Sequence, residues 1–140
     1  MLMKWQDFLS RVTQAGNGSL GDMAELLRSV GAKETAVAKK TGTASTGAVT
    51  LAALAGKITT EALSTAAGSL YTLTITNSMV AADDIVMASV QNGGASAGSP
   101  MIEKVTVAAG SIVILVKNVH SSAAFNGTLK IAFVVHRVAD

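Results

Sequence analysis

The chain lacks cysteine altogether and has few aromatic or charged residues. Its 140 residues include no Cys, two His and one Pro, with 4% aromatic and 14% charged residues. The absence of cysteine excludes disulfides, iron–sulfur clusters and cysteine-ligated zinc. An average soluble domain carries about 25% charged residues, so small polar and apolar groups must cover much of this surface. Such a surface predicts burial by neighbouring subunits.

The sequence also lacks the features that would indicate nucleic acid or a membrane as a partner. The formal net charge is only +2, and no basic stripe with interleaved aromatic residues occurs. No stretch approaches the ~20 apolar residues that cross a bilayer. The first seven residues lack the apolar core of a secretory signal. We therefore expect neither partner, and we expect synthesis and folding in a cytoplasm without export.

Two short amphipathic helices are predicted near the N-terminus, over residues 3–15 and about 20–30. Apolar residues recur there at the i, i+3, i+4, i+7 spacing of a helix. Helices this short are not stable alone, so residues 1–32 are expected to form a helical arm whose apolar side needs a partner. The candidate partner-binding residues are Trp5, Phe8, Leu9, Val12, Leu20, Met23 and Leu27.

The single tryptophan and one of the three phenylalanines lie in the same turn of the first predicted helix. Trp5 and Phe8 could cover the hydrophobic core of their own chain. They could also anchor the arm to another protein, since aromatic residues dominate interface hot spots. Insertion into a membrane is a third interpretation, which the short segment and the acidic Asp7 disfavour.

From Gly47 onwards the sequence is typical of short β-strands separated by turns. Residues 33–46 are expected to be a linker or an edge strand, and residues 47–140 a β-sandwich domain. Strands are predicted at 47–54, 57–64, 69–77, 84–91, 102–108, 111–119 and 127–138, with an extra strand at 34–41. This spacing favours a mainly β fold, an antiparallel sandwich or jelly roll of about seven or eight strands.

The period of two assigns the faces of three strands. One face of the strand at 69–77 is apolar and the other is threonine. The last strand has one strongly apolar face, whereas the strand at 111–119 is apolar on both faces, which indicates that a second surface covers it. The residues expected to face the core are Tyr71, Leu73, Ile75, Leu129, Ile131, Phe133 and Val135, and the two-sided strand contains Ile112, Val113, Ile114, Leu115 and Val116.

No arrangement of residues predicts catalysis. His120 and His136 have no further ligands at metal-binding spacing, so we expect solvated or hydrogen-bonded structural histidines. The Asp83-Asp84 pair precedes a strand and is interpreted as a turn or cap, and Glu61 and Glu103 are expected on solvent faces. No Gly-x-Ser-x-Gly elbow occurs. We therefore expect no enzyme, no cofactor and no metal.

Three segments together resemble a known group of proteins. These are residues 47–63, residues 73–78 (Leu-Thr-Ile-Thr-Asn-Ser) and residues 116–135, which include Val-Lys-Asn-Val-His-Ser-Ser. They resemble small β-sandwich virion proteins of tailed bacteriophages, which serve as capsid decoration (cement) proteins, head fibres and tail-fibre modules. The resemblance covers about residues 42–138. It implies a homo-oligomer, most often a trimer, that docks on a virus particle and has no enzymatic residues.

Two functional hypotheses follow. The first is a capsid decoration protein on the virion surface, which forms a homotrimer, binds the major capsid protein through the N-terminal arm and stabilises the capsid. The second is a head-fibre or tail-fibre module that binds a host glycan or protein through loops 92–100 and 120–127.

Overall fold

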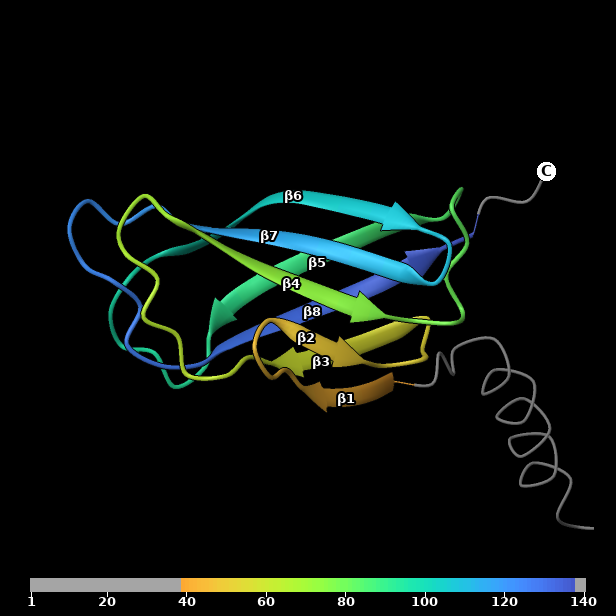
Figure 1. Ribbon diagram of the computed structural model, residues 1–140, viewed down its shortest axis with the longest axis horizontal. Helices are drawn as coiled ribbons and strands as arrows, with labels where there is room; N and C mark the ends of the chain where they lie inside the picture. The colour runs from red at the N-terminus through yellow and green to blue at the C-terminus, as the bar shows by residue number, and fades with distance from the viewer. Residues whose placement is uncertain (1–38, 138–140) are drawn as a thin grey trace, which may run out of the picture. The chain divides into compact units, whose positions relative to one another are not determined.

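The computed structural model describes residues 39–137, which form eight strands and, within that range, no helix (Figure 1). The prediction of a mainly β fold with about seven or eight strands is confirmed. The two predicted N-terminal helices lie outside the described residues. The strands are β1 (Lys39–Thr43), β2 (Ala48–Thr50), β3 (Ala55–Thr59), β4 (Leu70–Thr76), β5 (Ile85–Asn92), β6 (Pro100–Ala108), β7 (Ser111–Asn118) and β8 (Leu129–His136).

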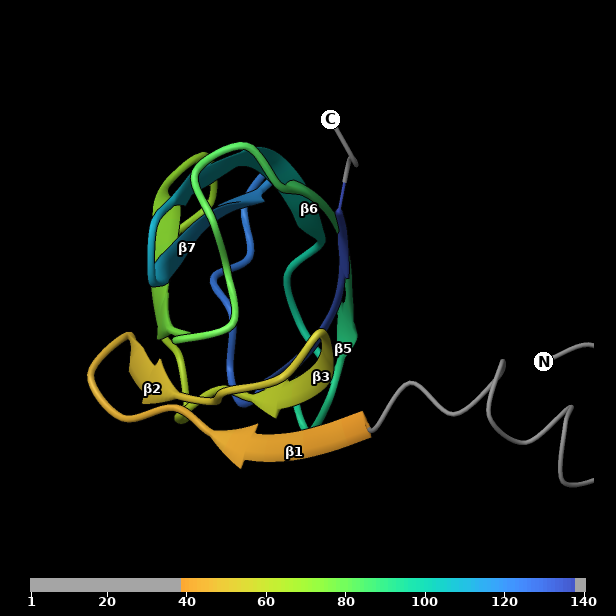
Figure 2. The same cartoon turned by 90° about the vertical axis from the view of Figure 1, so that its right-hand side faces the viewer.

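The strands form two four-stranded sheets in a sandwich-like arrangement. Sheet A has the order β1-β3-β8-β5 and sheet B has the order β2-β4-β7-β6. The end-on view of Figure 2 shows β5 and β7 on opposite sides of the interior. Four of the six strand pairs are antiparallel, but β1–β3 and β2–β4 are parallel. The prediction of a purely antiparallel sandwich is wrong for these two pairs.

The parallel pairs follow from the path of the chain. Strands β1 to β4 alternate between sheet A and sheet B, and the chain reverses direction at each crossing. Alternate strands therefore run the same way and meet as parallel neighbours. The later pairing is nested: β3 pairs with β8, β4 pairs with β7, and β5 and β6 lie between them in sequence but in different sheets.

The inner faces of both sheets form one hydrophobic core. In β7, Ile112, Ile114 and Val116 are fully buried, and the alternate residues are half-buried. The predicted inward faces of β4 and β8 are confirmed, because Tyr71, Leu73, Ile75, Leu129, Ile131, Phe133 and Val135 are all buried. Each such aliphatic or aromatic side chain contributes about 1.5–3 kcal/mol when it leaves water. This core fixes which residues point outwards.

Strand β2 is shorter than the predicted strand at 47–54, and a buried amide explains where it ends. The Leu51 N–H still donates to the Thr76 carbonyl at 2.9 Å. Beyond it, the side chain of Asn77 replaces a partner strand: its Oδ1 accepts from the Ala53 N–H at 3.2 Å, and its Nδ2 donates to the Ala53 carbonyl at 2.6 Å. Asn77 is fully buried, so these bonds satisfy its amide without water.

Candidate functional site

The predicted partner-binding residues all lie outside the described part of the chain. They are Trp5, Phe8, Leu9, Val12, Leu20, Met23 and Leu27. Within residues 39–137, no group of three or more His, Asp or Glu side chains is placed to hold a metal ion. The same residues include no helix that is long and apolar enough to cross a membrane. The candidate functional features of the described part are its two ends and its two outer faces.

His120 has a structural role, as predicted. Its Nδ1 accepts hydrogen bonds from the Ser122 N–H at 3.1 Å and the Ala123 N–H at 2.8 Å. The ring thus closes the turn that follows β7 and acts as an acceptor. His136, at the end of β8, is exposed.

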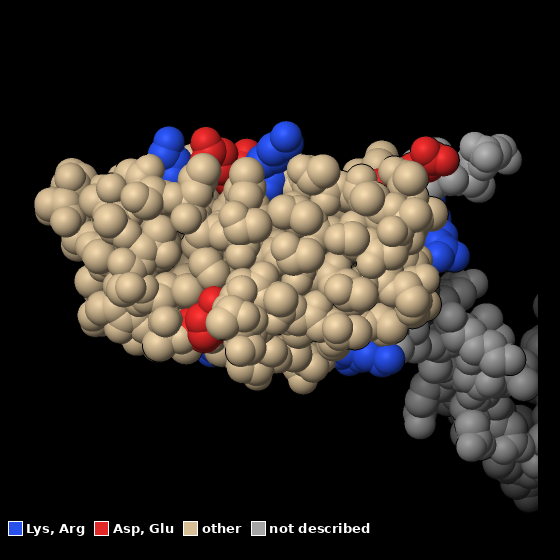
Figure 3. All heavy atoms as spheres, in the orientation of Figure 1, with Lys and Arg blue, Asp and Glu red and all other residues tan. Residues whose placement is uncertain are grey.

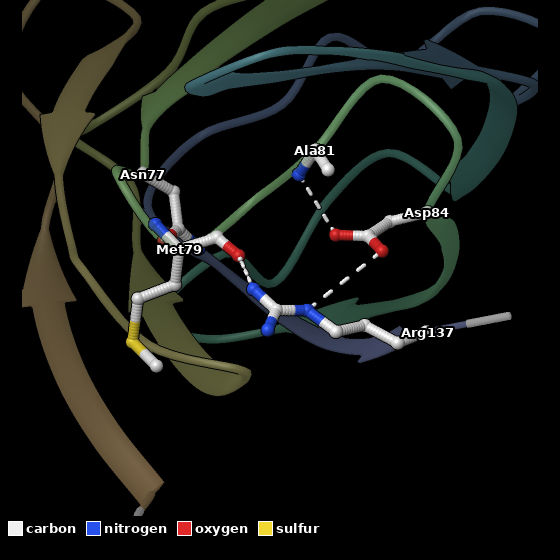
Figure 4. Close-up of polar contacts among 5 residues, drawn as sticks. All are labelled: Asn77, Met79, Ala81, Asp84 and Arg137. Carbon is white, nitrogen blue, oxygen red and sulfur yellow. Dashed lines mark hydrogen bonds and ion pairs between the residues drawn. The ribbon is translucent and has the colours of Figure 1, made fainter. Parts of the chain in front are cut away.

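One end of the sandwich is closed by Asp84 and Arg137 (Figure 4). Asp84 Oδ2 accepts from the Ala81 N–H at 2.8 Å, which confirms the predicted turn. Asp84 Oδ1 lies 3.9 Å from Arg137 Nε, and Arg137 Nη2 donates to the Met79 carbonyl at 2.6 Å. Met79 is held in turn by its N–H, which donates to Asn77 Oδ1 at 3.1 Å. The residue after β8 is thereby tied to the loop between β4 and β5.

Glu61 is not on a solvent face, contrary to the sequence-based expectation. Its Oε2 accepts from the Tyr71 hydroxyl at 3.0 Å, and its Oε1 accepts from the Gly47 N–H at 2.8 Å. Burial raises the pKa of Tyr71 well above its ordinary value, and the negative charge of Glu61 and the hydrogen bond to it add to that rise. The carboxylate therefore joins the loop after β3 to β4 and to the turn before β2. The expectation failed because it extended the alternation of inward and outward residues beyond Thr59, where β3 ends. Glu103, by contrast, is exposed, as expected.

The other end of the sandwich is organised around Asn118, which is fully buried. Its Oδ1 accepts from the Ser99 N–H at 3.0 Å and the His120 N–H at 3.2 Å. Its Nδ2 donates to the carbonyls of Thr65 at 3.1 Å and Ala123 at 2.8 Å. One side chain thus fixes three separate loops. A polar residue at a strand end resembles an ordinary turn residue in sequence, so this role was missed.

Loops 92–100 and 120–127, the predicted host-binding loops, lie together at this end. Asn126 Oδ1 accepts from the N–H groups of Ser96 and Ala97, both at 2.8 Å. The Gly94 N–H donates to Thr128 Oγ1 at 2.8 Å. Phe125 is buried under the loops, so its ring cannot serve as an exposed stacking platform. The loops form a cross-linked cap.

The outer face of sheet B has threonine and aliphatic side chains at its centre. Val113 and Leu115 are half-buried there. Register places Thr74 beside Val113 and Thr72 beside Leu115, with Thr106 of β6 on the other side of Val113. Figure 3 views this face: the area over β4 and β7 is almost free of charge, and most charged groups lie at its margins.

The outer face of sheet A has a different chemistry. Among the described residues, its outward strand positions include Lys39, Lys57 and Lys130, and its four strands contain neither Asp nor Glu. The same face exposes large apolar side chains: Ile85 is 56% exposed, Met87 64% and Val134 40%. Sequence patterning placed residues on this face but did not show that lysines and apolar groups from separate strands come together.

Comparison with known proteins does not assign a family. No family model, no curated protein and no solved structure matches this chain. Function is therefore inferred from the chemistry of the two outer faces and the two ends.

Proposed function

We propose that this chain is a structural virion protein of a tailed phage, which decorates the capsid surface as a homo-oligomer, most simply a trimer, and stabilises it. The observation that carries the proposal is the charge-poor centre of the outer face of sheet B, over β4 and β7, whose charged residues Glu103, Lys104 and Lys117 lie towards the β6 edge. Val113 lies there between Thr74 and Thr106, and Leu115 lies between Thr72 and Lys104. Surfaces that combine aliphatic groups with few charges match the cores of protein interfaces. This face supports contact with a second copy of the chain.

The same proposal includes the finer features of the fold. The nested pairing of β3 with β8 and of β4 with β7 supports a jelly-roll winding. Residues 1–32 form a helical arm whose apolar residues, led by Trp5 and Phe8, bind the major capsid protein. In this account sheet B supplies contacts between copies, and the arm supplies the principal attachment to the particle. The chain has no catalytic role.

A binding assay on particles tests the proposal. The purified full-length chain is added to tailed-phage heads assembled without it, and the heads are pelleted. We expect saturable binding with a fixed number of chains per head, and heads that resist heat better than undecorated ones. A chain that stays in the supernatant at every concentration would contradict decoration.

A second candidate function rests on the joined loops 92–100 and 120–127. Their cross-links through Asn126 give a preformed surface, as a head-fibre or tail-fibre module that recognises a host glycan or protein would require. A glycan array and a host-cell binding assay on the purified chain test this function. Binding that is lost in Asn126→Ala would support it, and the decoration account predicts no such binding.

A further inference from the structure

The outer face of sheet A contains an open hollow of about 300 Å³ that is lined by two lysines. Lys57 lies beside Ala132 in the register and Lys130 lies beside Thr59. The two lysines are therefore diagonal neighbours, whose Cα atoms are about 7–8 Å apart. The remaining lining residues are Ser89, Val90, Gln91 and Ala132. No carboxylate is present among them. Two ammonium groups, with a hydroxyl and an amide nearby, form a surface suited to carboxylate groups.

A second hollow, of about 210 Å³, adjoins the first and is apolar. It is lined by Met87, Ala88, Ser89, Ala132, Phe133 and Val134, so Ser89 and Ala132 border both hollows. Met87 and Val134 are direct register partners, and both are exposed. Met87 and Val134 form one row across the strands, and Ser89, Ala132 and Lys57 form another. The two rows are two residues apart along each strand, a distance of about 7 Å.

We propose that these two hollows bind an acidic, apolar polypeptide segment of the particle to which the chain attaches. The inference rests on the proposed function, because it names the chemistry of the partner's contact. Apolar side chains of the segment lie against Met87 and Val134, and its carboxylates lie against Lys57 and Lys130. In an extended peptide, residues i and i+2 are also about 7 Å apart on one face, which matches the spacing of the two rows.

Charge and apolar exposure together favour a polypeptide over an acidic glycan. The lysines alone would suit either ligand. Only a ligand with apolar side chains would also cover the exposed Met87 and Val134. Glycan sites also use exposed aromatic rings, whereas Tyr71, Phe125 and Phe133, the aromatic residues of the described part, are all buried.

The experiment measures binding of labelled synthetic peptides to the full-length chain by fluorescence anisotropy. The probe, Ser-Leu-Ser-Leu-Ser-Glu-Ser-Glu-Ser, places leucines and then glutamates on one face. Two control peptides replace Glu with Lys, or Leu with Ser. We expect saturable binding of the probe alone, at least tenfold weaker in the double variant Lys57→Glu with Lys130→Glu and several-fold weaker in Met87→Ser. The milder pair Lys57→Gln with Lys130→Gln serves as the test if charge reversal prevents folding.

Matched controls lie on the outer face of sheet B. Lys104→Glu and Met101→Ser change the same residue types at exposed strand positions and are expected to leave binding unchanged. The inference is overturned if the unaltered chain does not bind the probe, if the lysine peptide binds equally well, or if the sheet A variants bind like the controls. Binding of polygalacturonate but not of the probe would assign the face to an acidic glycan instead. None of these results depends on particles, so a failure here is distinguishable from a failure of capsid decoration.

Discussion

The hydroxyl of Tyr71 donates a 3.0 Å hydrogen bond to Oε2 of Glu61, ten residues earlier in the chain. Tyr71 is buried in β4, and the other oxygen of the same carboxylate accepts from the Gly47 N–H at 2.8 Å. The carboxylate of Glu61 therefore links two segments, the loop after β3 and the turn before β2, to Tyr71 in the core. Its contribution to stability can be measured from the tyrosine side.

Removing the hydroxyl in Tyr71→Phe should lower the free energy of unfolding by about 1–2 kcal/mol, because a partly buried hydrogen bond to a charged acceptor is lost. Denaturant unfolding measures the change. Glu61→Gln is the matched control, since its amide oxygen can accept from the Gly47 N–H while its amide N–H donates to the Tyr71 oxygen, and it should cost less. Equal stability of Tyr71→Phe and the unaltered chain would show that the bond contributes nothing.

The same pair predicts a specific loss of stability at alkaline pH. Burial and Glu61 raise the pKa of Tyr71 in the folded chain above its ordinary value of 10.0, whereas the unfolded chain ionises near that value. The stabilisation is therefore complete below pH 10.0 and decreases as the pH rises towards the folded pKa. Unfolding at increasing pH should show a steeper loss for the unaltered chain than for Tyr71→Phe. The raised pKa would be contradicted if the free energies of unfolding of both proteins fell equally with pH. It would also be contradicted if this single tyrosine gave phenolate absorbance near pH 10.0 in the folded chain.

Asn118→Ala should destabilise the fold by about 3 kcal/mol, since it removes the partner of the Ser99 and His120 N–H groups and of the Ala123 carbonyl, all partly buried. The four hydrogen bonds of this side chain join the loops at one end. The exposed Asn126 also accepts two backbone hydrogen bonds at this end, and Asn126→Ala should cost less than about 1 kcal/mol because water can replace it. Thermal or denaturant unfolding compares the two variants, and equal losses would contradict the role of burial.

Oligomer formation through sheet B predicts that Thr72→Glu dissociates the oligomer. Thr72 is exposed and lies beside Leu115, so a carboxylate there would be buried between copies at high cost. Thr41→Glu is the control, because Thr41 is also an exposed strand residue but belongs to sheet A. Light scattering after size-exclusion chromatography should give three chains for the unaltered protein and for Thr41→Glu, and one chain for Thr72→Glu. A monomeric unaltered protein, or a trimeric Thr72→Glu, would exclude this interface.

The N-terminal arm predicts that Trp5→Ala with Phe8→Ala abolishes capsid binding while the β domain stays folded. The physical reason is the loss of two large aromatic anchors, the residues that most often dominate binding energy. Co-sedimentation with heads measures binding, and circular dichroism checks the fold. If the double variant still decorates heads at normal occupancy, the anchor is elsewhere.

Much of the fold could be predicted from the sequence, because buried strands leave a strong period-two signal. The inward residues of β4 and β8 were predicted individually, as were both faces of β7. Strand neighbours could not be predicted, since the same alternation fits a parallel or an antiparallel partner. The parallel pairs of β1 and β2 depend instead on the chain crossing between sheets.

The candidate surfaces were harder to predict, because they combine residues that are distant in sequence. Lys57 and Lys130 come together only through the pairing of β3 with β8. Asn77 directly follows the threonine-rich strand β4, and Asn118 is the last residue of the aliphatic strand β7. This shared position at a strand end is the one signal that could have identified them as buried amides. Their opposite locations follow from the antiparallel pairing of β4 with β7.

The central claim is that this chain is a capsid decoration protein, and a density map of the purified particle tests it most directly. The account predicts density for the eight-stranded sandwich on the outside of the head, in threefold clusters, with the lysine-bearing face of sheet A towards the capsid protein and sheet B between copies. Density for the sandwich on the tail or a fibre tip, or a particle that lacks the chain altogether, would contradict it.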